Sequence, residues 1–302
     1  MPESPLPTTV RRPSIVRFAT GRRPGYFRAK NPLDAAAPVL GRLGTLETRL
    51  ARSKSEIREA QALRYDVFFR EMSAVPNPIT RLLGRDKDGW DAVCDHLLVI
   101  ERAGGGERIV GTYRFLRAET ARLARRPFYT QSEFDVAPLM ARHGDLDFME
   151  LGRSCVLPDW RTRRTIELLW HGTWAYVLSN RVDVMIGCAS FHGTDPAALA
   201  EPLSFLYHNA SPGDDWEVAA RGREKIGMNL LGAGAINARR AMHALPPLIK
   251  GYLRLGARFG REAVIDRRFG TTDVLVILPV ANINPRYLDY YGADAGRHAV
   301  TA

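Results

Sequence analysis

The residue types at positions 149–164, MELGRSCVLPDWRTRR, suit acid–base chemistry. If residues 148–157 form a strand, side chains alternate, so Glu150 lies on one face and Arg153 on the other. Burial among apolar neighbours would raise the pKa of Glu150 towards the range of a general base. Arg153 can be its ion-pair partner only if the strand bulges between the two residues.

The second half of this segment is basic. Arg161, Arg163 and Arg164 stand where a helix over residues 165–178 is expected to begin. The free backbone N–H groups and the dipole of a helix N-terminus favour a bound anion. A strand that leads through a basic turn into a helix therefore indicates a phosphate site.

Four aspartates follow a predicted helix over residues 56–71, at Asp86, Asp88, Asp91 and Asp95. Such a group of carboxylates could bind a cationic ligand or a metal ion, and it could equally be a solvated acidic loop. The seven histidines and three cysteines show none of the paired spacings of a zinc site, so no metal is predicted.

The composition is that of a globular chain: 302 residues, 45% hydrophobic and 25% charged. Nucleotide-binding P-loop and serine-hydrolase motifs are absent. The run Gly232-Ala-Gly234 lacks the third glycine of a dinucleotide loop, and no strand clearly precedes it. No apolar run reaches the roughly 20 residues of a membrane span, and three unpaired cysteines suit the cytoplasm. The net charge of +10 favours anionic partners, namely nucleic acid, acidic lipid or an acidic protein.

The elements needed to position these residues follow from hydrophobic periodicity. The helix over residues 56–71 has Ser55 as its expected N-cap. The pattern as a whole predicts an α/β protein with a mixed central sheet flanked by helices. Strands are expected over 46–51, 96–101, 109–116, 148–157, 184–191 and 274–280, and helices over 56–71, 165–178, 196–207 and 247–255.

The chain divides into three parts. Residues 1–44 form a Pro-containing arm, whose first 30 residues carry seven basic side chains against Glu3 alone. We expect this arm to be flexible and to lie on anionic headgroups, or to be a tail without a role. Residues 45–292 form the folded domain, and residues 293–302 a tail.

Several segments together resemble the GNAT acyltransferase superfamily. They are LRYDVFFREM (63–72), the aspartate cluster ending in CDH (94–96), and ELGRSCVLPDWRTRRTIELLWHG (150–172). The L-R-x-x-V-F pattern and the later E-x-x-R are also similar to acyl-homoserine-lactone synthases. The segments 184–196, 245–257 and 264–292 resemble, with the others, the bacterial L-ornithine N-alpha-acyltransferases, so the likeness covers roughly residues 45–292.

The resemblance implies a GNAT-like fold and a reaction in which acyl carrier protein donates a 3-hydroxyacyl group to the α-amine of L-ornithine. The product would be lyso-ornithine lipid, in the first step of ornithine-lipid synthesis. Acetyl-CoA users of the superfamily carry Q/R-x-x-G-x-G/A at the helix start, whereas Arg164 and Ile166 occupy the small-residue positions here. The departure favours the single phosphodiester of a carrier protein's acyl-phosphopantetheine, and no permanently bound cofactor is expected. Acyl carrier protein is acidic, so it would be attracted electrostatically to this positively charged chain.

The roles expected for individual residues follow. Glu150 is the base and Arg153 braces it or binds the substrate carboxylate, as Arg64 could. Backbone N–H groups of the segment Cys155, Val156 and Leu157 would stabilise the oxyanion. The pantetheine phosphate is placed at Arg161, Arg163, Arg164 and Thr165, and the acceptor near Arg64, Phe68, Asp86, Asp88 and Asp91, whose carboxylates would hold the ornithine side-chain ammonium.

Three other functions remain open at this point. An acyl-homoserine-lactone-type synthase shares the donor and the fold, a CoA-dependent N-acetyltransferase shares only the fold, and a non-catalytic module could bind anions or membranes. Cys155 could also carry the acyl group covalently, although no histidine is visibly paired with it. The expected location is the cytoplasm, with the inner-membrane surface as a peripheral partner, and no nucleic acid is expected.

Overall fold

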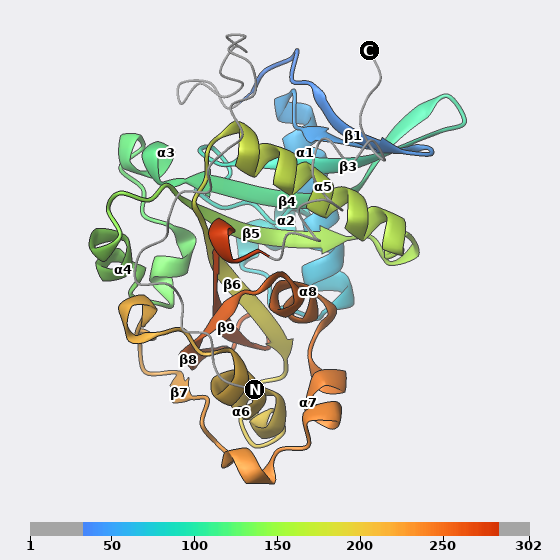
Figure 1. Cartoon of the computed structure of the whole chain (residues 1–302). Coiled ribbons are helices and arrows are strands. Elements are labelled where there is room, and N and C mark those ends of the chain that lie inside the picture. The colour runs from blue at the N-terminus through green and yellow to red at the C-terminus, as the bar shows by residue number, and fades with distance from the viewer. Residues whose placement is uncertain (1–32, 284–302) are drawn as a thin grey trace. The chain divides into compact units, whose positions relative to one another are not determined.

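The computed structural model describes residues 33–283 (Figure 1). The chain divides into two compact units. Among the described residues, the N-terminal unit comprises 33–127 and 151–182, and the C-terminal unit comprises 128–150 and 183–283. The expected arm and tail lie largely outside the described residues, so their character stays a prediction. None of the helices within 33–283 has the length and apolar character needed to span a bilayer.

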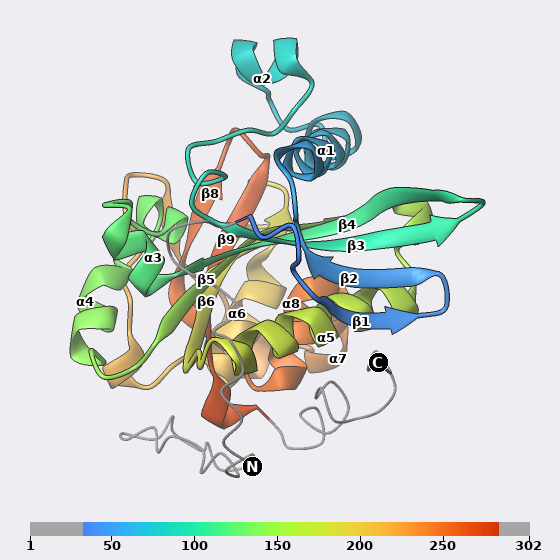
Figure 2. The ribbon, with the colours of Figure 1, turned by 90° about the horizontal axis from the view of Figure 1, so that it is seen from above.

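The N-terminal unit is an antiparallel sheet between two helices. Strands β1, β2, β3 and β4 follow one another in the sheet, and α1 packs on β4 while α5 packs on β1, β2 and β3 from the opposite side (Figure 2). Its elements are β1 (Val39–Leu43), β2 (Leu46–Leu50), α1 (Lys54–Tyr65), a π-helical turn (Asp66–Glu71), α2 (Pro78–Leu83), β3 (Asp95–Ala103), β4 (Gly106–Arg117), α3 (Ala118–Leu123) and α5 (Arg163–Ser179).

Strand β5 (Phe148–Val156) belongs to both units. Its first three residues are part of the C-terminal unit. The remaining six residues belong to the N-terminal unit, where the strand lies beside β4 and the Leu157 N–H donates to the Val110 carbonyl at 2.9 Å.

The C-terminal unit contains a second antiparallel set of strands in the order β6-β9-β8-β7. Helix α6 packs on β8, and α8 packs on β6 and β9. Its elements are α4 (Val136–Arg142), β6 (Val184–His192), α6 (Ala200–Ala210), β7 (Lys225–Gly227), α7 (Ala238–Ala244), α8 (Pro247–Leu255), β8 (Arg258–Asp266) and β9 (Thr271–Pro279), with short 3-10 turns at Tyr129–Ser132, Asp214–Trp216, Ala233–Ala235 and Val280–Asn282.

Helix α5 lies unusually close to the strands beneath it. A Cβ atom added at Gly172 would come within 2.8 Å of Thr48 Oγ1 and 3.0 Å of a Leu97 methyl carbon. Only glycine allows this approach, because a larger side chain would force the helix away from the sheet. The close packing holds the start of α5, where the basic residues stand, in a set position on the N-terminal unit.

The expected α/β class, with sheets flanked by helices, is confirmed. Every predicted strand and helix is present, although α6 begins four residues later than expected, at Ala200. The N-cap of α1 is Ser53 rather than Ser55, since the Ser53 side chain accepts the Glu56 N–H at 3.2 Å. Strand β1 lies inside the segment assigned to the arm and pairs with β2.

Candidate active site

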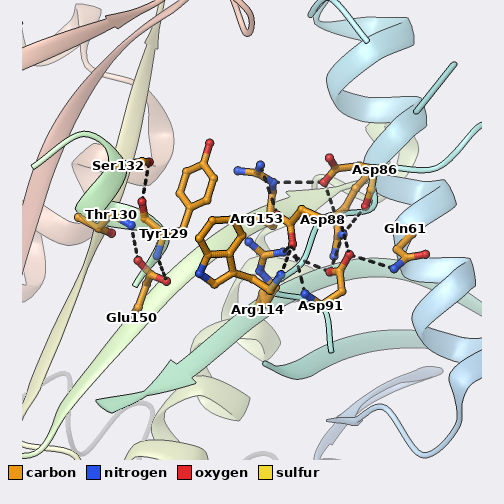
Figure 3. Close-up of polar contacts among 12 residues, drawn as sticks. Gln61, Asp86, Asp88, Asp91, Arg114, Tyr129, Thr130, Ser132, Glu150 and Arg153 are labelled. Atoms are coloured by element: carbon orange, nitrogen blue, oxygen red, sulfur yellow. Dashed lines mark hydrogen bonds and ion pairs between the residues drawn. The ribbon is translucent and has the colours of Figure 1, made fainter. Parts of the chain in front are cut away.

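Glu150 lies in the first part of β5 and is 5% exposed. Its Oε1 accepts the Thr130 N–H at 2.6 Å, and its Oε2 accepts the Tyr129 N–H at 2.9 Å (Figure 3). Both donors belong to one 3-10 turn, which the Ser132 hydroxyl closes by donating to the Tyr129 carbonyl at 2.7 Å. The turn thus presents two adjacent N–H groups to one carboxylate.

Hydrogen bonds from N–H donors stabilise the ionised form of a carboxylate. Each oxygen of Glu150 accepts one such bond. A buried carboxylate held in this way has a defined orientation and can accept a proton from a ligand. The geometry therefore suits a general base.

Arg153 stands where β5 departs from regular strand geometry. Its φ is +55°, in the left-handed region that residues other than glycine seldom adopt. From this position its Nε lies 3.2 Å from Asp86 Oδ2, and its second terminal nitrogen, Nη2, lies 3.8 Å from Asp88 Oδ2. From this local deviation the side chain of Arg153 reaches the aspartate cluster. The expected ion pair between Arg153 and Glu150 stays a prediction.

Arg64 is the centre of that cluster. Its side chain is fully buried, with Nε 2.9 Å from Asp86 Oδ2 and Nη2 2.8 Å from Asp91 Oδ1. Nη2 also donates to the Asp86 carbonyl. Helix α1 and the loop before β3 are therefore tied together by a buried guanidinium.

Two further members of the cluster were not predicted from the sequence. Arg114 of β4 lies 2.7 Å from Asp88 Oδ1 and 3.2 Å from Asp91 Oδ1, and Gln61 of α1 donates to Asp91 Oδ2 at 2.9 Å (Figure 3). A signal for Arg114 was present, since it is the one charged residue among the apolar neighbours of the expected strand 109–116. Gln61 has no such signal.

The charges of this cluster balance. Burial alone would raise the pKa of Asp86, but Arg153, Arg64 and Arg114 outweigh it and lower the pKa. The pKa of Asp91 is likewise lowered, because Arg64 and Arg114 overcome the effect of burial. Burial, then Arg64, lowers the pKa of His96 to about 4, so this histidine is neutral.

Three aspartates facing three arginines have no net charge to offer a cation. The structure therefore favours a bracing role for Asp86, Asp88 and Asp91, which connect α1, β4 and β5. Asp95, the fourth acid of the sequence cluster, faces elsewhere and accepts the Tyr176 hydroxyl at 2.6 Å.

An apolar group lies beside the cluster in the same unit. Leu63, Val67 and Cys155 are buried together, and Phe68 and Leu157 pack against them. Burial raises the pKa of the Cys155 thiol to about 12. Because the thiolate is the nucleophilic form, this cysteine is poorly suited to carry an acyl group.

The expected phosphate-binding residues divide into two groups. Arg161 forms a two-bond ion pair with Glu71, at 2.5 and 2.6 Å, and its Nε donates to the Val156 carbonyl. The Thr165 N–H is taken by the Thr162 side chain, which caps α5. Arg163 and Arg164 are exposed at the first turn of the helix. Arg161 is exposed as well, so all three arginines of the expected set lie at the surface of the protein.

The backbone N–H groups expected to bind the oxyanion are those of Cys155, Val156 and Leu157, and the structure accounts for one of them. The Leu157 N–H is bonded to the Val110 carbonyl, so it is not a donor for an oxyanion in this conformation. The N–H groups of Cys155 and Val156 stay predictions.

A comparison with known protein families gives the class of protein to which this fold and site belong. The acetyltransferase (GNAT) domain family model matches residues 63–171, which include Arg64, the aspartate cluster, Glu150, Arg153 and the start of α5. The chain thus contains a GNAT domain, as the sequence motifs indicated.

Relatives narrow the class. The chain is 55% identical over 262 residues to the L-ornithine N(alpha)-acyltransferase of Agrobacterium fabrum, covering 86% of this chain and 89% of that protein. It is 54% identical over 265 residues to the L-ornithine N(alpha)-acyltransferase of Rhizobium meliloti, covering 87% and 89%. The chain belongs to the L-ornithine N(alpha)-acyltransferase family and is an N-acyltransferase.

The matches among solved structures are more distant. The AHL synthase LasI matches over 85% of this chain and 96% of its own, with 12% identity and a TM-score of 0.41. A likeness at this level does not bear on the choice of acceptor.

Proposed function

We propose that this chain transfers a (3-hydroxy)acyl group from acyl carrier protein to the α-amine of L-ornithine, giving lyso-ornithine lipid. The observation that carries the proposal is the identity of 51–55% to three L-ornithine N(alpha)-acyltransferases, over 86–87% of the chain. The buried, N–H-bonded Glu150 supports it because an ammonium must lose a proton before it can attack a thioester.

The proposed reaction has a simple proton balance. Glu150 takes one proton from the α-ammonium, directly or through water. The neutral amine then attacks the thioester carbon, and the tetrahedral intermediate carries its charge on oxygen, towards the N–H groups of Cys155 and Val156. Collapse breaks the C–S bond and forms the amide, and the second proton of the amine passes to the leaving thiolate of phosphopantetheine.

The donor is assigned to a carrier protein on the character of α5. Arg163 and Arg164 are exposed at its first turn, where the helix dipole also favours an anion. Arg164 and Ile166 replace the small residues that let a CoA pyrophosphate approach the backbone in acetyl-CoA users. An acidic carrier protein would be attracted to this basic turn.

The decisive experiment incubates the purified chain with 3-hydroxyacyl carrier protein and ornithine, lysine, glutamine or glycine. N-acylornithine, identified by mass spectrometry, is the expected product. Transfer from acyl-CoA without carrier protein, or release of a homoserine lactone, would refute the proposal. So would salt-sensitive anion binding without acyl transfer from any donor.

Carrier docking has its own test. The double variant Arg163→Glu, Arg164→Glu should raise KM for the carrier protein, and the difference should shrink as salt is added. Arg254→Glu, at an exposed position near the end of α8, serves as the matched control. Equal KM values in the double variant and the control would remove the basic turn from donor recognition.

We also propose peripheral association with the inner membrane, where the lipid product must arrive. Residues 1–30 carry seven basic side chains and one acidic one. In the described chain, Ile79 and Leu82 of α2 are 69% and 85% exposed. Removing residues 1–32 should weaken sedimentation with anionic vesicles and spare acyl transfer between soluble substrates. Unchanged sedimentation would contradict the proposal.

A further inference from the structure

Strands β6, β9 and β8 lie side by side in the C-terminal unit (Figure 1). Their register places acidic and polar residues of all three strands on one face. Thr271 of β9 is opposite Asp266 of β8, and Asp273 of β9 is opposite Ser190 of β6. Directly opposed residues of antiparallel strands, and alternate residues of one strand, project from the same face. Asp266, Thr271, Asp273 and Ser190 therefore share this face.

Three carboxylates converge there. Oxygens of Glu133, Asp266 and Asp273 all lie within 4.8 Å of one another. Glu133 is 8% exposed and Asp273 is 6% exposed, so both are largely removed from water. Like charges this close repel one another unless a cation or a proton lies among them.

Glu133 connects this group with Glu150. It directly follows the 3-10 turn Tyr129–Ser132 that holds Glu150, and its N–H donates to the Thr130 carbonyl at 3.0 Å. The Thr130 N–H in turn donates to Glu150 Oε1 at 2.6 Å. The carboxylate group and the proposed base are thus joined through one turn of the C-terminal unit.

A second, independent observation points to a ligand. The Thr271 hydroxyl is buried, at 2% exposure, and has no hydrogen-bond partner among the described residues. By the strand register it projects beside Asp266 and from the same face as Asp273. A buried hydroxyl left without a hydrogen bond is destabilising, and a ligand N–H placed there would remove that cost.

We infer that Glu133, Asp266 and Asp273, with Thr271, form the subsite for the side-chain ammonium of the acceptor, which makes the enzyme selective for a diamino acid. The inference rests on the proposed function. Three points no more than 4.8 Å apart lie within 4.8/√3, about 2.8 Å, of a common centre, which suits charge-assisted N–H···O bonds. An ammonium has three donors and can serve all three carboxylates.

The position beside Glu150 explains how one amine would be chosen. Ornithine has two amines, separated by its carbon chain. An acidic subsite that holds the side-chain amine in its charged form prevents that amine from attacking, because an ammonium is not a nucleophile. The α-amine is then the one presented to Glu150, in agreement with the Nα position in the names of the relatives.

Norvaline, which has the carbon chain of ornithine without the second amine, is the probe that tests the inference. In the wild type, kcat/KM should be higher for ornithine than for norvaline. Asp273→Asn and Glu133→Gln should each lower that preference about 10- to 100-fold, chiefly through KM for ornithine, and leave norvaline nearly unchanged. Glu224→Gln, an exposed acid paired with Arg267 in the same unit, is the matched control.

Binding measured by calorimetry without donor gives the same comparison independently of turnover. If no amino acid is acylated but ornithine still binds more tightly than norvaline, and Asp273→Asn abolishes the difference, the proposed reaction fails while the subsite stands. An unchanged ornithine-to-norvaline ratio in both variants overturns the subsite. It is also overturned by equal losses for the two ligands, or by activity that a chelator removes and a divalent metal restores.

Discussion

Two groups of acidic residues, one in each unit, look alike in composition and differ in their surroundings. Asp86, Asp88 and Asp91 of the N-terminal unit are matched by Arg64, Arg114 and Arg153. Glu133, Asp266 and Asp273 of the C-terminal unit lie within 4.8 Å of one another. Carboxylates that each face a guanidinium group connect elements of the fold. Carboxylates that converge on one another favour a cationic ligand, and this convergence is the ground on which we propose a binding role for the second group.

Substitutions in the two units should also differ in their effect on the free energy of unfolding. Breaking a buried ion pair leaves an uncompensated charge and destabilises the fold. Removing a carboxylate that receives a substrate proton changes the rate and has a smaller effect on folding. Variants in the two regions should therefore separate stability from activity.

The largest expected effect is in the C-terminal unit. Glu150→Gln should lower kcat about 10²–10⁴-fold, because glutamine keeps the shape but cannot accept the proton. The melting temperature should change little by comparison, since one amide oxygen still accepts a backbone N–H. Steady-state kinetics with carrier-bound donor, together with thermal melts, measure both quantities. A near-normal kcat would show that Glu150 takes no part in the reaction. It would also contradict the expectation that this region affects activity more than stability.

The next effect belongs to the N-terminal unit. Arg64→Met should lower the free energy of unfolding by about 3–5 kcal/mol, because Asp86 and Asp91 lose their buried partner. Arg70→Met is a matched control on the adjoining π-helical turn, since its ion pair with Asp66 is exposed and should contribute less than about 1 kcal/mol. Urea denaturation compares the two. Equal stabilities would show that the cluster does not brace the fold.

The smallest effect is a dependence on pH. The folded-state pKa values of Asp86 and Asp91 are lowered, so their stabilising contribution is present above the unfolded value of about 4 and is lost as the pH falls below it. The free energy of unfolding should therefore decrease between about pH 5 and about pH 3. In Asp86→Asn the decrease should be shallower. Denaturation curves of the wild type and of Asp86→Asn across this pH range test the prediction. Equal slopes of the free energy of unfolding against pH in the two proteins would contradict it.

Much of the site was visible in the sequence because its residues occur in short segments. Alternation along 148–157 placed Glu150 in a strand, and the basic turn after it marked the start of α5. The same alternation places Arg153 on the other face of a regular strand, and the left-handed backbone at Arg153 shows that the strand is not regular there. Local patterns carry this information because strand and helix geometry repeat over two to four residues.

Tertiary structure alone decided which charges meet. The sequence suggested that Asp86, Asp88 and Asp91 would hold a substrate ammonium, and the fold instead brings them three guanidiniums, including that of Arg114. Gln61 gave no signal at all. Glu133 is more than a hundred residues from Asp266 and Asp273 along the chain, so no spacing could have indicated that the three converge. Periodicity determines which face a side chain occupies, but the counter-ion of a buried charge depends on which distant segments the core packs beside it.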